Sequence, residues 1–173
     1  MYLHITKIRL KTSMSHFEIR EIQTKDNQQV AEVIRTVLVE FGVPKVGTAY
    51  EDEALNDMFE AYNNPNMVYF VVEDHNKIIG GAGIAPLPEA EGVCELQKMY
   101  FLDVARGKGV GSKMMHTCLE YAKTLGFKTC YLETLPYMMS ATALYKKTGF
   151  KNLEGPLGNT GHYSCNVWMT KAL

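Results

Sequence analysis

The chain has 173 residues, with 18 basic and 19 acidic side chains and a formal net charge of −1, which is typical of one domain that buries its own core. Because the charges nearly cancel, the composition favours neither nucleic acid nor an anionic membrane surface as a partner. No apolar run approaches the roughly 20 residues that cross a bilayer and no signal sequence is evident, so we expect a cytoplasmic protein.

Residues 1–16 show no sustained period and are expected to be an N-terminal extension or tail, ahead of one domain at 17–173. That domain opens with a strand from Phe17 to Ile22. A helix running to about Phe41 follows, because apolar side chains recur there at intervals of three and four residues.

A shorter helix is expected at 55–62, followed by an antiparallel hairpin of strands 68–72 and 78–84. Three glycines in the second strand, Gly80, Gly81 and Gly83, are expected to leave one strand face bare. Further along the chain we expect a strand at 93–102, a helix at 109–125, a strand at 129–134, a helix at 140–148, and closing strands at 150–153 and 162–170. This order indicates a mixed α/β sandwich.

The four cysteines are widely spaced and form no C-x-x-C pair. We interpret Cys94, Cys118, Cys130 and Cys165 as buried thiols. A zinc site is the weaker alternative, because the usual ligand spacing is absent, and no metal is expected.

The most informative segment joins the strand at 93–102 to the helix that follows. It reads Arg106-Gly107-Lys108-Gly109-Val110-Gly111-Ser112. Glycines let several backbone N–H groups face one point, the helix N-terminus adds partial positive charge, and Arg106 and Lys108 add whole charges. The segment therefore predicts a cradle for a pyrophosphate.

Two other nucleotide motifs do not fit this segment. The Walker pattern requires glycine five residues after its first glycine, and Ser112 stands at that distance from Gly107. The dinucleotide fingerprint requires G-x-G-x-x-G after the first strand of a βαβ unit, whereas here the glycines alternate late in the chain.

Arg106-x-x-Gly109-x-Gly111 resembles the Q/R-x-x-G-x-G/A signature of the GNAT acetyltransferases. A second segment, from Ala141 to Phe150, is similar to the A-x-A-L-Y-x-K-x-G-F run of that family's last helix. The resemblance covers nearly the whole chain. It implies the GNAT fold, a central, mostly antiparallel twisted sheet of about six or seven strands flanked by about four helices.

The resemblance also implies acetyl-CoA as cosubstrate. The backbone near Met99, Tyr100 and Phe101 would bind the pantetheine arm, and the amides from Arg106 to Ser112 would bind the pyrophosphate. The family often has an asparagine seven residues before its tyrosine. Here Met138 takes that place, and Ser140 is the candidate substitute for the lost contact.

Tyr145 stands at the family's tyrosine position and would donate a proton to the departing thiolate. Without the motif, a tyrosine on a short amphipathic helix would be taken as a packing residue. Glu95 and Glu133 lie in apolar strands where burial would raise their pKa, so each is a candidate general base, and His162 is a third.

The acceptor is expected to be a primary amine on a small molecule or a peptide, attacked directly. Acidic residues of the linker and second helix would attract a cation, although a solvated helix face is the plainer interpretation; they are Glu51, Asp52, Glu53, Asp57 and Glu60. Four tyrosines could line a pocket or simply pack: Tyr50, Tyr62, Tyr137 and Tyr163. The alternative function is a catalytically silent acetyl-CoA sensor or scaffold. A homodimer is possible, with Trp168 either at its interface or in the core.

Overall fold

The structure is a computed structural model that describes residues 17–46, 49–158, 160 and 165–173. Residues 1–16 lie outside the described residues, so the domain boundary at residue 17 stays a prediction. The described part contains one seven-stranded sheet in the order β1-β2-β3-β4-β5-β7-β6. All neighbouring strands are antiparallel except β4 and β5, which confirms the expected mixed α/β fold.

The strands are β1 (Glu18–Glu21), β2 (Val68–Asp74), β3 (Lys77–Pro86), β4 (Val93–Phe101), β5 (Thr129–Thr134), β6 (Lys151–Asn152) and β7 (Val167–Ala172). The helices are α1 (Asn27–Glu40), α2 (Met58–Ala61), α3 (Val110–Thr124) and α4 (Met139–Thr148). Short 3-10 turns flank them at Thr24–Asp26, Ala49–Glu51, Glu53–Asn56 and Asp103–Ala105.

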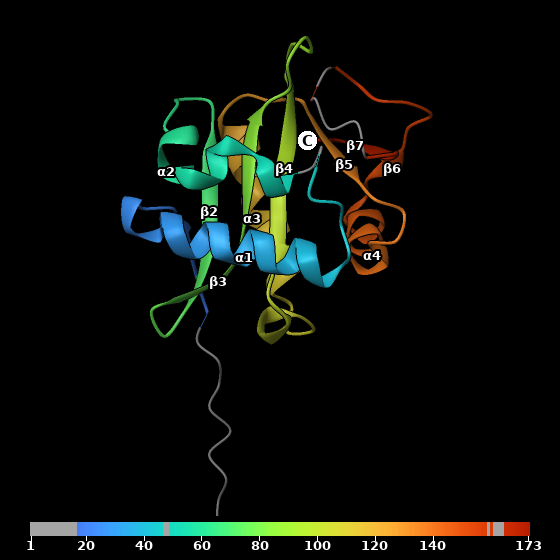
Figure 1. Cartoon of the computed structure of the whole chain (residues 1–173). Helices are drawn as coiled ribbons and strands as arrows, with labels where there is room; N and C mark the ends of the chain where they lie inside the picture. Colours follow the sequence, from blue (N-terminus) through green and yellow to red (C-terminus); the bar gives the residue numbers. More distant parts are fainter. Residues whose placement is uncertain (1–16, 47–48, 159, 161–164) are drawn as a thin grey trace, which may run out of the picture.

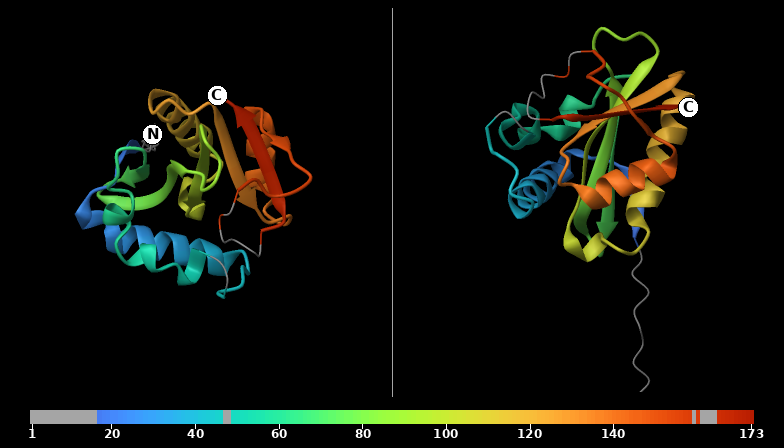
Figure 2. Two further views of the ribbon diagram at one scale, coloured as in Figure 1. Left: turned by 90° about the horizontal axis from the view of Figure 1, so that it is seen from above. Right: turned by 90° about the vertical axis from the view of Figure 1, so that its right-hand side faces the viewer.

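The sheet lies between two helical layers. Helix α1 crosses one face, and α3 packs against the opposite face (Figures 1 and 2). Strand β2 is buried on both sides: Phe70 and Val72 belong to the core beside α3, whereas Tyr69 and Val71 belong to the core beside α1. This double burial explains why β2 is an unbroken apolar run rather than an alternating one.

The glycines of β3 are covered rather than bare, which corrects the expectation. A Cβ on Gly83 would lie 2.6 Å from the Tyr62 ring, and one on Gly81 would lie 2.6 Å from the Tyr69 ring. Both rings belong to the core beside α1. A Cβ on Gly80 would instead lie closest to Phe101, which packs on the core beside α3. The glycines therefore make room for aromatic rings on both faces.

The helix expected at 55–62 is divided in two at Asp57. This residue ends a 3-10 turn and caps α2, because its Oδ1 accepts the N–H of Glu60 at 3.1 Å and the side-chain amide of Asn27 at 2.7 Å. The caps hold α2 against α1. Asp57 thus has a structural role on this face.

The closing strands are also shorter than expected. Phe150 turns into the core and leaves β6 with two residues, and β7 begins at Val167, while residues 161–164 of the expected strand lie outside the described residues. Strand β7 lies between β5 and β6, and Trp168 on it is half-buried. The homodimer stays a prediction.

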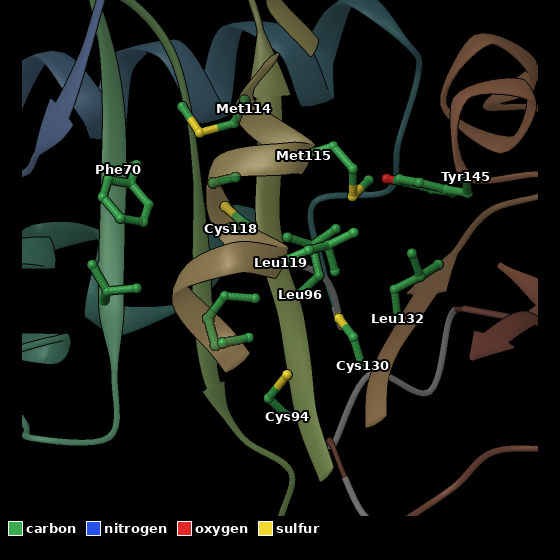
Figure 3. Packing of buried hydrophobic residues seen from close by; sticks show 14 of the residues in the cluster. Phe70, Cys94, Leu96, Met114, Met115, Cys118, Leu119, Cys130, Leu132 and Tyr145 are labelled. Atoms are coloured by element: carbon green, nitrogen blue, oxygen red, sulfur yellow. The ribbon is translucent and has the colours of Figure 1, made fainter. Parts of the chain in front are cut away.

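Three of the four cysteines are buried as expected. Cys94, Cys118 and Cys130 lie in the core beside α3 (Figure 3), and Cys165 is half-buried. Within the described ranges no three or more His, Cys, Asp or Glu side chains are grouped so as to hold a metal ion. No helix in the same part of the chain has the length and apolar character to cross a membrane.

Candidate active site

The centre of the sheet opens where β4 and β5 part. The two strands pair only from Val93 to Glu95, opposite Thr129 to Tyr131. Strand β4 continues to Phe101, so in the described structure its backbone from residue 96 onward has no strand partner on the β5 side. Unpaired backbone N–H and C=O groups at such an edge need other partners, and a bound chain can supply them.

A bulge at Lys98 marks this opening. Lys98 has a positive φ of 49°, and the pairing with β3 shifts register between Gly81 and Gly83. The Tyr69 hydroxyl donates to the Lys98 carbonyl at 3.1 Å, and Lys98 Nζ lies 2.7 Å from Asp52 Oδ2. Because a bulge bends its strand, these contacts help to hold the end of β4 away from β5.

The glycine-rich loop connects β4 to α3. Gly107 and Gly109 have φ of 70° and 76°, a region that residues with a Cβ rarely enter. Residues 107–109 precede α3, and 110–112 belong to its first turn. Within the described residues, no backbone carbonyl outside the regular elements accepts a hydrogen bond from the N–H groups of 107–112. These donors and the helix N-terminus are groups that can bind an anion, so the predicted cradle stays a candidate site.

The side chains around this cradle are directed by packing. Val110 is buried in the core, so only its backbone can contribute, and a Cβ on Gly111 would lie 3.3 Å from a Leu144 methyl carbon of α4. Ser112 and Lys108 are exposed, and Lys108 Nζ lies 5.8 Å from the Phe17 ring centroid. The small residue at 111 therefore lets α3 approach α4 closely.

Arg106 does not present the expected groups to an anion. Its N–H donates to the Asp103 carbonyl at 3.0 Å, and its guanidinium makes two hydrogen bonds to Glu40, one of them 2.7 Å long. A further bond joins its Nε to the Phe101 carbonyl at 3.0 Å, and its charge lies 4.9 Å from the Phe41 ring centroid. Arg106 thus ties the loop to the end of α1, and its charge is already paired.

Two cavities meet beneath α4. The larger, of about 480 Å³, follows the open edge of β4 to the loop, and its walls include these expected residues: Met99, Tyr100, Phe101, Arg106, Gly107, Gly111, Ser140 and Tyr145. The smaller, of about 90 Å³, contains both candidate bases, Glu95 and Glu133. Met138 and Tyr145 line both cavities, so they lie at the junction.

Tyr145 reaches this junction from α4. Figure 3 shows its ring extending from the helix, with its oxygen directed toward the side of Met115 on α3. The side chain is buried, and this burial raises the pKa of its phenol well above the usual value of 10.0. At neutral pH Tyr145 therefore keeps its phenolic proton.

Glu95 is 2% exposed on β4. Burial raises the pKa of its carboxyl to about 7, and the charge of Glu133 acts in the same direction. The Gln97 amide, which donates to Glu95 Oε2 at 2.6 Å, opposes that rise in pKa, as does Lys98. A carboxyl with a pKa near neutrality can both accept and release a proton under ordinary conditions.

Glu133 has different surroundings on β5. It is half-buried, and its Oε1 accepts from the Tyr131 hydroxyl at 2.8 Å and from the Thr160 hydroxyl at 2.9 Å. These bonds fix its position in the cavity wall. The third candidate base, His162, and the candidate pocket residue Tyr163 lie outside the described residues.

Among the described residues, the acidic side chains of the linker and second helix do not line either cavity, although Ala49 of the same linker lines the smaller one. Asp52 pairs with Lys98 and caps the turn at Glu53–Asn56, whereas Glu51, Glu53 and Glu60 are exposed. Together with the capping role of Asp57, this favours the plainer interpretation of a solvated, capped segment. Of the tyrosines, Tyr62 is buried, Tyr50 lies beneath Lys45 and Tyr137 is exposed.

Three residues around the cavities were missed by sequence reasoning. Gln97 follows Glu95 by two positions in one strand, so strand periodicity could have placed both on one face. Cys165 lines the smaller cavity, and burial raises its pKa to about 11, which keeps it a thiol. Glu40 carried no local signal, because its partner Arg106 is 66 positions away.

Known proteins resemble this chain over most of its length. The sequence model of the Acetyltransferase (GNAT) family matches residues 30–150. The chain is 42% identical over 157 residues to the Escherichia coli K12 protein named "Uncharacterized N-acetyltransferase YjgM", which covers 90% of this chain and 94% of that relative. It is 27% identical over 136 residues to human N-acetyltransferase 8B, across 74% of this chain and 57% of the relative.

Solved structures agree in fold. A GNAT-family acetyltransferase from Staphylococcus aureus Mu50 superposes with a TM-score of 0.81 at 20% identity, over 91% of this chain and 99% of the other. The PaiA N-acetyltransferase of Thermoplasma acidophilum, solved in complex with coenzyme A, gives a TM-score of 0.74 at 18% identity over the same shares. The family match and the Escherichia coli relative show that this chain belongs to the GNAT acetyltransferase family and is an acyltransferase.

Proposed function

We propose that the protein is an acetyl-CoA-dependent N-acetyltransferase that moves an acetyl group to a primary amine by direct attack. One observation carries this proposal: a cavity that begins at the glycine loop and a cavity that holds two carboxylates share a wall at Tyr145. A donor substrate in the first cavity and an amine in the second would meet at a buried phenol.

The residues around the larger cavity fit coenzyme A. A Cβ at Gly109 would project into space where no atom of a non-adjacent residue lies within 4 Å, and within the described residues the N–H groups of 107–112 donate to no backbone carbonyl outside the regular elements. That space and those donors suit a pyrophosphate, and the open edge of β4 at Met99, Tyr100 and Phe101 suits an amide-bearing arm. When bound, acetyl-CoA supplies an acetyl group on a good leaving group. The structural neighbour that binds coenzyme A has the same fold.

The contacts beyond the cradle rest on apolar packing. Met138 offers no amide at the position where related enzymes often have asparagine, and Ser140 lines the same cavity with an exposed hydroxyl. One hydrogen bond contributes about 1 kcal/mol net, so its loss lowers affinity without abolishing binding.

The chemical step uses Glu95 and Tyr145. Glu95 takes one proton from the ammonium form of the acceptor, and the freed nitrogen lone pair attacks the thioester carbonyl carbon. The carbon–nitrogen bond forms and the carbon–sulfur bond breaks. Tyr145 gives its proton to the departing sulfur, and the second proton that the nitrogen loses returns to the phenol through water. The net products are the acetamide, the free thiol and one released proton.

The polarity of the smaller cavity supports an amine as acceptor. Glu133 and Glu95, the latter in its ionised form, line it, and the charge of Lys98 in the same wall is paired with Asp52, so an ammonium group entering there would find negative charge. Its volume of about 90 Å³ suits the amine end of a larger molecule rather than a whole one, so the acceptor can be a small molecule or a peptide. No observation favours the silent sensor or scaffold over an enzyme.

The test combines binding with turnover. Calorimetry measures acetyl-CoA affinity, and a free-thiol assay across primary amines measures transfer, for the wild type and for the Tyr145→Phe, Glu95→Gln and Glu133→Gln variants. We expect Tyr145→Phe and Glu95→Gln to bind acetyl-CoA normally but to turn over at least about 100-fold more slowly. Full turnover in either variant would remove that residue from the mechanism, and no acetyl-CoA binding by the wild type would overturn the proposal.

A further inference from the structure

A hydrogen-bonded chain of three side chains leads from α2 to the carboxylate in the smaller cavity. The Tyr62 hydroxyl donates to Gln97 Oε1 at 2.8 Å, and the Gln97 Nε2 donates to Glu95 Oε2 at 2.6 Å. We propose that Tyr62 and Gln97 are positioning residues that keep an amide donor on Glu95 and thereby favour its ionised form. This inference rests on the proposed function, in which Glu95 is the general base.

The backbone places these side chains together. Glu95 and Gln97 are two positions apart in β4, ahead of the bulge at Lys98, so both project from the same face of the strand. Tyr62, at the end of α2, reaches this face across Gly83, where a Cβ would lie 2.6 Å from its ring. A side chain at position 83 would therefore displace the Tyr62 ring and break its hydrogen bond to Gln97.

The amide of Gln97 has two orientations that fill the same space, and Tyr62 selects one of them. With Oε1 toward Tyr62, the phenol proton has an acceptor and the NH₂ group faces Glu95. In the reversed orientation the NH₂ group would face Tyr62, and the buried phenol would have no acceptor for its proton. Since a buried donor without a partner is costly, the reversed orientation is disfavoured. Burial also raises the pKa of Tyr62 well above its usual value, so the proton stays available for this bond.

The selected orientation matters for the chemistry of Glu95. An N–H donor stabilises the carboxylate, whereas a carbonyl oxygen in the same place would stabilise the protonated acid. Burial already favours the protonated acid, so the amide offsets part of that effect. Without it, a smaller fraction of Glu95 would be ready to accept a proton at neutral pH.

Other charged or titratable groups also bear on Glu95 within the described part of the chain, and the experiment leaves them in place. On β4 the group is Lys98, on β5 they are Tyr131 and Glu133, and ahead of β7 it is Cys165. None of these side chains is altered in the variants below. A change in the pKa of Glu95 would therefore report on the hydrogen bonds from Tyr62 to Gln97 and from Gln97 to Glu95.

The test follows the titration of Glu95 itself. Carbon-13 NMR of protein labelled at glutamate side-chain carboxyls gives the pKa of each carboxyl, and Glu95→Gln identifies the resonance of Glu95 by its loss. We expect Gln97→Met, which keeps the length of the side chain without the amide, to raise the pKa of Glu95 by about one unit or more. Tyr62→Phe should raise it in the same direction by less, because the amide remains but is free to reverse.

Tyr69→Phe is the matched control. It removes a hydroxyl from an equally buried ring that lies 5.2 Å from the Tyr62 ring, but that hydroxyl donates to the Lys98 carbonyl rather than to Gln97. Because the ion pair of Lys98 with Asp52 remains in this variant, we expect the pKa of Glu95 to change much less than in Gln97→Met. Thermal melts establish that each variant is folded over the pH range used.

The outcomes separate this inference from the proposed function. An unchanged pKa of Glu95 in folded Gln97→Met and Tyr62→Phe would overturn the inference, and so would an equal rise in Tyr69→Phe. Full activity of Glu95→Gln would instead overturn the role of Glu95 as base while leaving the titration result standing. If both proposals hold, the acidic limb of the pH–rate profile moves to higher pH in Gln97→Met by the same amount as the pKa.

Discussion

Replacing Gly109 by valine tests the cradle most directly. Gly109 has φ of 76°, where a residue with a Cβ loses roughly 1–2 kcal/mol, and no atom lies within 4 Å of the position that the Cβ would take. The variant should therefore fold, with a melting temperature lowered by roughly 2–8 °C. The added side chain would occupy open space beside the loop, where the proposal puts the pyrophosphate, so we expect acetyl-CoA affinity to fall by at least about tenfold.

The control is Gly126→Val at the opposite end of α3. Gly126 has φ of 86° and also has no atom within 4 Å of a Cβ, so the backbone strain is of the same kind. It follows the C-terminal end of the helix, away from the loop. We expect a similar loss of stability and unchanged affinity for acetyl-CoA.

Calorimetric titration with acetyl-CoA, together with thermal melts of both variants, decides between the possibilities. Equal affinity in wild type and Gly109→Val would show that the loop does not hold the pyrophosphate. Equal loss of affinity in the two variants would show that strain, rather than occupation of the cradle, weakens binding. Either result would refute the reasoning.

Three further predictions follow from the same geometry. In Tyr145→Phe we expect kcat to fall at least about 100-fold with KM for acetyl-CoA unchanged, measured by thiol release; a parallel rise in KM would indicate a packing role instead. Glu40→Gln should raise KM for acetyl-CoA several-fold, because it releases Arg106 from the end of α1. The control Glu120→Gln, which loses the exposed pair with Lys123, should leave KM unchanged. Equal KM values in the two variants would show that the Arg106–Glu40 pair does not position the loop. The pKa of Glu95 is raised from 4.5 to about 7, so between pH 4.5 and about pH 7 the folded protein binds more protons than the unfolded chain. The contribution of this residue to the free energy of unfolding therefore falls as pH rises through that range. Glu95→Gln should therefore stabilise the protein more at pH 8 than at pH 5 in thermal melts, and a pH-independent difference would argue against the raised pKa.

The sequence was most informative where local backbone determines the outcome. Alternating glycines between a strand and a helix require a tight turn that presents N–H groups, and Gly107 and Gly109 do adopt positive φ. Apolar periodicity placed the main helices and most strands to within a few residues. Elements whose ends depend on caps or on a turn into the core were less predictable, as the division at Asp57 and the short β6 after Phe150 show.

The candidate site needed contacts between distant segments. Arg106 stands beside the glycines in sequence, yet its charge is paired by Glu40, 66 positions earlier. Glu95 and Glu133 are indistinguishable as carboxylates in apolar strands. In the fold, Glu95 is almost fully buried beside Gln97, whereas Glu133 is held by hydroxyl groups from Tyr131 and Thr160.

The sequence by itself therefore determined the family, the glycine loop between a strand and a helix, and the set of candidate side chains, because each rests on short segments whose chemistry is local. The tertiary structure alone decided which charges are already paired, that the two cavities meet at Tyr145, and that Tyr62 reaches Gln97 across Gly83. The burial and charge pairing of a side chain depend on which distant segments the fold brings within a few ångströms of it, so a short stretch of sequence does not predict them.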